Sequence, residues 1–116
     1  MKNLLENNEC KNQVLVILHK VFHMYELILK ACSLLDVEIA KSVYKLDDKI
    51  DSMFSKIVFS VSSSISDKLL SVRFGADLMF IAKYGERIGD RCVNISKWII
   101  YIENGFFPDR TFLNDV

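Results

Sequence analysis

The fold is decided by the segment 66–104, SDKLLSVRFGADLMFIAKYGERIGDRCVNISKWIIYIEN, which contains no proline and no cluster of turn-forming residues. Its apolar residues recur at steps of three or four, which is the period of a helix. Gly105 and Pro108, which follow the segment, favour a helix end there. The segment therefore predicts one helix over 66–104, about 57 Å long at a rise of roughly 1.5 Å per residue. The expected inward face is Leu70, Phe74, Asp77, Ile81, Tyr84, Ile88, Cys92, Ile95, Ile99 and Ile102.

Three glycines, Gly75, Gly85 and Gly89, lie inside this predicted helix. Each costs about 1 kcal/mol relative to alanine in a helix interior. They indicate either that another backbone comes close to the helix or that the helix is locally loose.

Two further helices are predicted upstream, over 10–34 and 37–63. The expected stripe of the first is Val14, Leu18, Val21, Tyr25, Leu29 and Cys32. The expected stripe of the second is Ala40, Val43, Leu46, Ile50, Met53, Phe54, Ile57 and Val61. Asp36 is the expected N-cap of the second helix, and Ser64 with Asp67 resembles a capping box that would open the third.

Three long helices joined by short turns must pack up-down-up into an elongated antiparallel bundle. We therefore expect an all-α protein with a single domain over 1–116. The ends, 1–9 and 106–116, are expected to be flexible or docking termini. Phe106, Phe107 and Phe112 in the second of these can dock on the bundle or on a partner.

Composition and charge exclude several classes of protein. Hydrophobic residues make up 51% of the chain, which excludes disorder, and 15 basic residues balance 15 acidic ones, which argues against nucleic-acid binding. The most apolar stretch, 14–35, is interrupted by five polar side chains, so a transmembrane helix is not expected. Three widely spaced cysteines indicate a reducing compartment, and we expect a cytoplasmic protein.

Two pairs of acidic residues are spaced four apart, Asp47 with Asp51 and Glu86 with Asp90. Residues at this spacing lie on the same face of a helix, and the two pairs fall at a similar height in an antiparallel bundle. Carboxylate oxygens are the ligands that hard cations prefer, so the four residues are candidate metal ligands, and Asn94 is a possible additional one. The alternative is a solvated face, on which Lys49 and Arg87 neutralise the acids without a metal.

Other chemistry is poorly supported. His19, His23 and Glu26 have a spacing that can chelate zinc, but HExxH is absent and these residues flank the apolar stripe, so we expect a rim position with partly buried rings. The chain contains neither GxSxG nor a glycine-rich phosphate loop, and we expect it not to be an enzyme.

The segment 77–105, DLMFIAKYGERIGDRCVNISKWIIYIENG, resembles the C-terminal signature of the PhoU family. The matching elements are the ERIGD sequence at 86–90, Asn94-Ile95, the apolar stretch 98–101 and Gly105. Upstream, Asp36-x-x-x-Ala40 and the acidic cluster at 47–51 are similar to the second helix of that family. The resemblance covers roughly residues 14–109.

This resemblance implies a regulator of phosphate uptake and of the phosphate-starvation response, commonly a negative regulator. It implies two partners, the ATPase of the phosphate ABC transporter and a phosphate-sensing histidine kinase, with membrane contact only through them. It also implies a divalent or trivalent metal (Fe, Mn, Mg or Zn) at Asp47, Asp51, Glu86 and Asp90.

The chain also departs from the family pattern. A typical member has two such repeats and this chain has one; Arg91 stands where the family commonly has His, and Gly85 where it often has Leu. A lone bundle leaves apolar surface exposed, which predicts a homodimer that rebuilds a six-helix unit. Interface candidates are Trp98, Tyr101, Phe106 and Phe107.

Two other hypotheses remain open at this point. The carboxylates themselves can be the function, in a helical metal-binding or metal-storage bundle with no signalling role. The chain can also be an oligomerisation remnant that binds no ligand.

Overall fold

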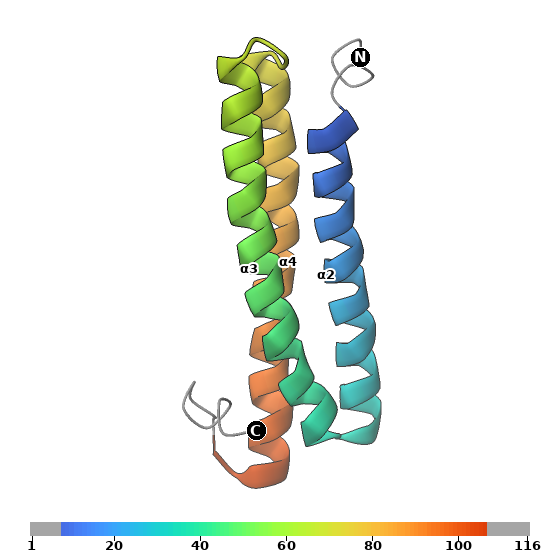
Figure 1. Ribbon diagram of the computed structural model, residues 1–116. Coiled ribbons are helices and arrows are strands. Elements are labelled where there is room, and N and C mark those ends of the chain that lie inside the picture. The colour runs from blue at the N-terminus through green and yellow to red at the C-terminus, as the bar shows by residue number, and fades with distance from the viewer. Residues whose placement is uncertain (1–7, 107–116) are drawn as a thin grey trace.

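The computed structural model describes residues 8–106 of the 116-residue chain, and these form three long helices with no strand among them. The helices are α2 (Asn8–Leu34), α3 (Val37–Ser66) and α4 (Val72–Asn104). They pack side by side in up-down-up order, so that α2 and α4 run in the same direction (Figure 1). The bundle measures 53 × 26 × 17 Å, and α4 with 33 residues accounts for about 50 Å of its length. The predicted all-α, elongated three-helix fold is confirmed, and the predictions for 1–7 and 107–116 lie outside the described residues.

The turn between α2 and α3 is only two residues long. Leu35 adopts a left-handed backbone conformation, with φ of 50°, and the Asp36 N–H donates to the carbonyl of Ala31 at 3.0 Å. A carboxylate oxygen of Asp36 then accepts a hydrogen bond from the Ile39 N–H at 3.1 Å. Asp36 is therefore the N-cap of α3, as predicted.

The turn between α3 and α4 differs from the prediction. The serine-rich segment does not break the helix, and α3 continues to Ser66, with Asp67 as its C-cap. Lys68 then turns the chain with a positive φ of 61°, and the Leu69 N–H donates to the Ser64 carbonyl at 2.8 Å. The N-cap of α4 is Ser71, whose hydroxyl accepts a hydrogen bond from the Phe74 N–H at 3.0 Å.

The predicted capping box at Ser64 and the predicted helix start at 66 are therefore wrong. Serine is unfavourable in a helix interior by only a few tenths of a kcal/mol, about the level of most residues, so a run of three does not end a helix. A chain reversal needs a residue in the left-handed region, and Lys68 takes that conformation although it is not a glycine.

The buried face of α2 follows steps that alternate between three and four residues. Its members are Cys10, Val14, Ile17, Val21, Met24, Ile28 and Ala31. The predicted stripe is right at Val14 and Val21, but Tyr25, Leu29 and Cys32 are exposed. Because a helix has about 3.6 residues per turn, repeated steps of four move around the helix and leave the buried side.

The predicted stripe of α3 is confirmed. Ala40, Val43, Ile50, Ile57 and Val61 are buried, while Leu46, Met53 and Phe54 are partly buried against the core. Sequence reasoning missed two buried residues on this helix, Tyr44 and Asp47.

The predicted inward face of α4 is mostly wrong. The residues buried on this helix are Gly75, Leu78, Ala82, Gly85, Gly89, Cys92, Ser96, Ile99 and Ile100. Of the predicted face, Cys92 and Ile99 are buried within the helix, and Leu70 is buried in the turn before it. Five large apolar members, Ile81, Tyr84, Ile88, Ile95 and Ile102, are exposed.

Side chains of the neighbouring helices occupy the space beside the inward-facing glycines of α4. A Cβ added at Gly75 would lie 2.7 Å from Cδ1 of Ile65, and one at Gly85 would lie 3.0 Å from Cδ2 of Leu18. These distances leave no room for a larger residue unless its neighbour moves. The atoms next to Gly75 and Gly85 belong to side chains of α3 and α2, so side chains, and not the backbone that the sequence analysis considered, fill the space at these glycines.

Candidate functional site

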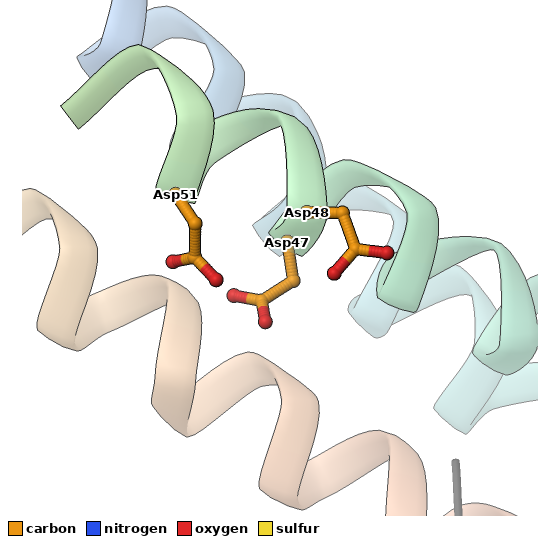
Figure 2. A group of neighbouring side chains, drawn as sticks. All are labelled: Asp47, Asp48 and Asp51. Carbon is orange, nitrogen blue, oxygen red and sulfur yellow. The ribbon is translucent and has the colours of Figure 1, made fainter. Parts of the chain in front are cut away.

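Three aspartates come together in the first half of α3. Asp47, Asp48 and Asp51 each offer one carboxylate oxygen, and these oxygens lie within 4.8 Å of one another. Figure 2 shows Asp47 and Asp51 directed from α3 towards α4, with Asp48 beside them. Three negative charges at this separation repel one another, and a hard cation reverses that repulsion. The donor set therefore fits a cation that prefers oxygen ligands.

Asp47 is the buried member of this cluster, with 9% of its surface exposed. It points at Gly89 of α4, where an added Cβ would lie 3.9 Å from Oδ1 of Asp47. This distance is an ordinary van der Waals contact, so the carboxylate of Asp47 lies directly beside Gly89 of α4. Burial of a charged carboxylate is costly unless a compensating charge or hydrogen bonds stabilise it.

The other two predicted ligands lie on α4 at the same height. Gly89 faces Asp47, and Nζ of Lys83 lies 5.3 Å from the centre of the Phe54 ring, so 83–90 runs antiparallel beside 47–54. The predicted matching of the two acidic pairs in height is consistent with this register.

Glu86 and Asp90 do not join the aspartate cluster. Oε1 of Glu86 accepts a hydrogen bond from Nζ of Lys83 at 2.7 Å, and Asp90 is exposed. Asn94 is also exposed, one helical turn beyond Asp90. Among the described residues the structure therefore brings together Asp47 and Asp51 with Asp48, which was not among the predicted ligands. The sequence signal for Asp48 was three aspartates within five residues.

Arg87, one of the basic residues inside the acidic motifs, lies beside an aromatic ring of its own helix. Its guanidinium carbon lies 5.6 Å from the centre of the Tyr84 ring, which is on the exposed side of α4. On α2, the side chains of His19, His23 and Glu26 are all exposed, so the two histidine rings are less buried than the rim position predicts.

Aromatic residues gather near the C-terminal end of α4. Trp98 and Tyr101 make an edge-to-face contact, with ring centres 5.6 Å apart and planes at 81°. Both are exposed, as is Phe106, so Trp98 is not a core residue of the isolated bundle. Phe107, the fourth interface candidate, lies outside the described residues.

The fold and the acidic edge of α3 define a class: an all-α bundle protein with a carboxylate cluster between two of its helices. A family model described as the PhoU domain matches residues 14–99 of the chain. Since this match covers most of the sequence, the chain belongs to the PhoU domain family, and the resemblance seen in its C-terminal signature is confirmed.

The chain is similar to curated proteins from bacteria and archaea. It is 31% identical over 78 residues to the phosphate-specific transport system accessory protein PhoU of Escherichia coli K12, covering 67% of this chain and 32% of that protein. It is 37% identical over 70 residues to a PhoU homolog 1 of Thermotoga maritima, covering 60% and 30%. It is 33% identical over 67 residues to a PhoU homolog 1 of Methanothermobacter thermautotrophicus, covering 58% and 31%.

The chain thus spans about a third of the length of the curated relatives it matches. No solved structure matches it significantly. Among the described helices, none combines the length and the apolar character that a membrane span requires.

Proposed function

We propose that this chain regulates phosphate uptake and phosphate-starvation signalling, as a negative regulator. Membership of the PhoU domain family, with ERIGD at 86–90 inside the matched region, is the observation that carries this proposal. The names of the similar proteins, which call them accessory proteins of a phosphate-specific transport system, support it. The role is regulatory and not enzymatic.

The regulator acts in the cytoplasm as an adaptor. Its partners are the ATPase of the phosphate ABC transporter and a phosphate-sensing histidine kinase, through which alone it meets the membrane. The exposed aromatic end at Trp98, Tyr101 and Phe106 supports this role, because aromatic side chains are enriched in protein interfaces. The net charge of zero argues against a general affinity for nucleic acid.

The regulator also binds a metal at the edge between α3 and α4. Asp47, Asp48 and Asp51 would hold it. Glu86 and Asp90, which lie on either side of Gly89 in the sequence of α4, would add further ligands. The bound cation, one of Fe, Mn, Mg or Zn, would neutralise the carboxylates and favour the arrangement in which α3 and α4 are packed together. A ligand that binds one state of a protein shifts its population towards that state, which is how metal occupancy can bias partner binding.

The regulatory proposal is tested in a bacterium that lacks its own PhoU protein and carries a phosphate-starvation reporter. Expression of this chain is expected to lower reporter output when phosphate is abundant. The variant Trp98→Ala is expected to lose that effect while remaining folded. Phe59→Ala, which changes an exposed aromatic residue on α3, is the control. A well-expressed chain that leaves the reporter unchanged would contradict the proposal.

The metal proposal is tested by elemental analysis of the purified chain and by thermal unfolding with each of the four metals. A metal present at one hundred times its Kd stabilises the folded state by about 2.7 kcal/mol. Asp47→Asn is expected to remove this shift, whereas Glu26→Gln, an exposed acid on α2, is expected to keep it. If the purified chain contains no metal and none of the four metals shifts its unfolding, the cluster is a solvated acidic edge.

A metal-binding or metal-storage bundle without a signalling role is the second candidate function. The close approach of three carboxylates in one cluster favours it. This second function predicts that the Trp98→Ala variant keeps its metal. It also predicts that the phosphate-starvation reporter does not respond to expression of the chain.

A further inference from the structure

The two histidines of the chain lie on the outer side of α2, away from the core. They are His19 and His23, and both side chains are exposed. His19 lies two residues after the buried Ile17, and His23 lies two residues after the buried Val21. Two residues correspond to about 200° around a helix, so both imidazoles leave α2 on the side opposite to its buried face. They are therefore separate from the aspartate cluster of α3.

Glu26 adds a carboxylate to the same side of α2. It lies three residues after His23 and seven residues after His19, and its side chain is exposed. Residues three or four apart are neighbours on the surface of a helix, one turn from each other. The helix α2 thus presents two imidazoles and one carboxylate in a single row.

None of these three side chains is engaged elsewhere in the described part of the chain. Within residues 8–106, His19, His23 and Glu26 take part in no hydrogen bond and no ion pair. Lys30 lies one turn beyond Glu26, and within the same range the two form no ion pair. Exposed side chains change rotamer within nanoseconds, so the row can rearrange around a ligand without disturbing the core.

This set of donors is the kind that late transition metals prefer. Two histidines at i and i+4 on a helix hold one metal ion between their ring nitrogens in zinc enzymes. A Glu and a His three residues apart on one helix are also a recurring ligand pair. Imidazole suits Zn, Cu, Fe and Ni, and mixed nitrogen and oxygen donors suit Ni²⁺ and Cu²⁺, whereas carboxylates suit Mg and Mn. The row on α2 therefore differs in donor chemistry from the cluster of Asp47, Asp48 and Asp51.

We propose that His19, His23 and Glu26 form a second metal site, which binds a late first-row divalent ion of the class of Ni²⁺ and Cu²⁺. The imidazoles supply two ring nitrogens and Glu26 supplies a carboxylate oxygen, while water fills the remaining coordination positions. Among the described residues the aspartates of α3 are the group of three whose ligand atoms already lie close together, and the ligand atoms of the α2 row converge by side-chain rotation. The proposal does not rest on the proposed phosphate function, because it uses neither the aspartate cluster nor Trp98.

The experiment is a titration of the full chain with Ni²⁺, followed by NMR of the histidine ring protons. The chain has only two histidines, so every histidine ring signal comes from this site. Paramagnetic nickel is expected to broaden both signals at a concentration equal to that of the chain, whereas Mg²⁺ is expected to leave them unchanged. His19→Ala and His23→Ala are each expected to weaken nickel binding about tenfold or more, because each removes a ligand, and Glu26→Gln is expected to weaken it as well.

A matched control keeps the number of histidines and changes only their spacing. His19→Ala combined with Phe22→His places the two imidazoles on adjacent residues, which do not face each other on a helix, so this variant is expected to bind nickel as weakly as His19→Ala alone. Asp47→Asn is expected to leave the broadening of the histidine signals as in the wild type. The substituted residues of α2 are exposed, so circular dichroism is expected to show intact helices.

Three results would overturn the proposal. The first is a wild-type chain whose histidine signals stay sharp with nickel. The second is a spacing control that binds nickel as tightly as the wild type. The third is unchanged nickel affinity in any of the three single variants of the row.

Discussion

The helices α3 and α4 both carry large apolar residues at helical spacing, but α3 buries these residues in the core whereas α4 exposes most of them. On α3 the large residues Ile50 and Ile57 are buried, and the exposed side is mostly polar, with Phe59 and Val58 as the large apolar exceptions. On α4 the glycines face the other helices, and large residues such as Tyr84 and Ile88 remain outside. The difference shows that a regular apolar stripe identifies a face that packs against something, but not whether that partner lies within the same chain.

The largest expected effect is a loss of stability on truncating a buried residue of α3, compared with an exposed residue of α4. Ile50→Ala removes a fully buried side chain of α3 and is expected to destabilise the fold by about 3 kcal/mol, since the substitution leaves a cavity. Ile88→Ala on the exposed face of α4 is expected to cost less than about 1 kcal/mol in a dilute sample. Urea unfolding of both variants measures the contrast. Equal losses would mean that α4 buries its large stripe after all.

A smaller effect is expected from filling the inward side of α4. Gly75→Leu places a side chain where even a Cβ would lie 2.7 Å from Ile65, and overpacking of this kind costs about 2 kcal/mol. Ala76→Leu, at the neighbouring exposed position, is the matched control and is expected to change stability by less than about 0.5 kcal/mol. Thermal unfolding compares them. A Gly75→Leu protein as stable as the control would argue against close packing at this point.

The smallest perturbation uses the native cysteines as probes of the same faces. Burial raises the pKa of the Cys92 thiol on the inward side of α4, so at neutral pH less of it is the reactive thiolate. Cys32 is exposed on α2. Alkylation with iodoacetamide, followed by mass spectrometry, is expected to label Cys32 at least about tenfold faster than Cys92. Equal rates would place Cys92 at the surface and reverse the assigned face of α4.

The fold was predictable from sequence because its signals are local. The lack of proline and turn residues through 66–104 predicts a long helix, and Asp36 at the head of α3 caps it as its type and position predict. The start of α4 was not predictable in the same way. Ser64 and Ser71 are both suitable N-cap residues. The helix begins after Ser71 because Lys68 adopts a left-handed conformation, which a lysine in the sequence does not predict.

The faces of α4 were not predictable from hydrophobicity, because two faces of that helix compete. The glycines were the decisive signal, since side chains of α2 and α3 pack into the space that they leave on α4. At the acidic edge, spacing predicted Asp47 and Asp51 as neighbours, and the structure adds Asp48. Whether Glu86 and Asp90 share a metal with them depends on the distance between carboxylates on two different helices. The spacing of residues along one helix does not determine that distance, so their role as ligands stays a prediction.

Trp98 is the single tryptophan of the chain, and 56% of its surface is exposed at the aromatic end of α4. Its fluorescence therefore reports on one place in the molecule. An indole in water emits at longer wavelength than one in an apolar contact, so a protein that settles on this end would shift the emission to the blue. The molecule carries its own optical label beside the surface where an adaptor would meet its target, and no dye has to be attached.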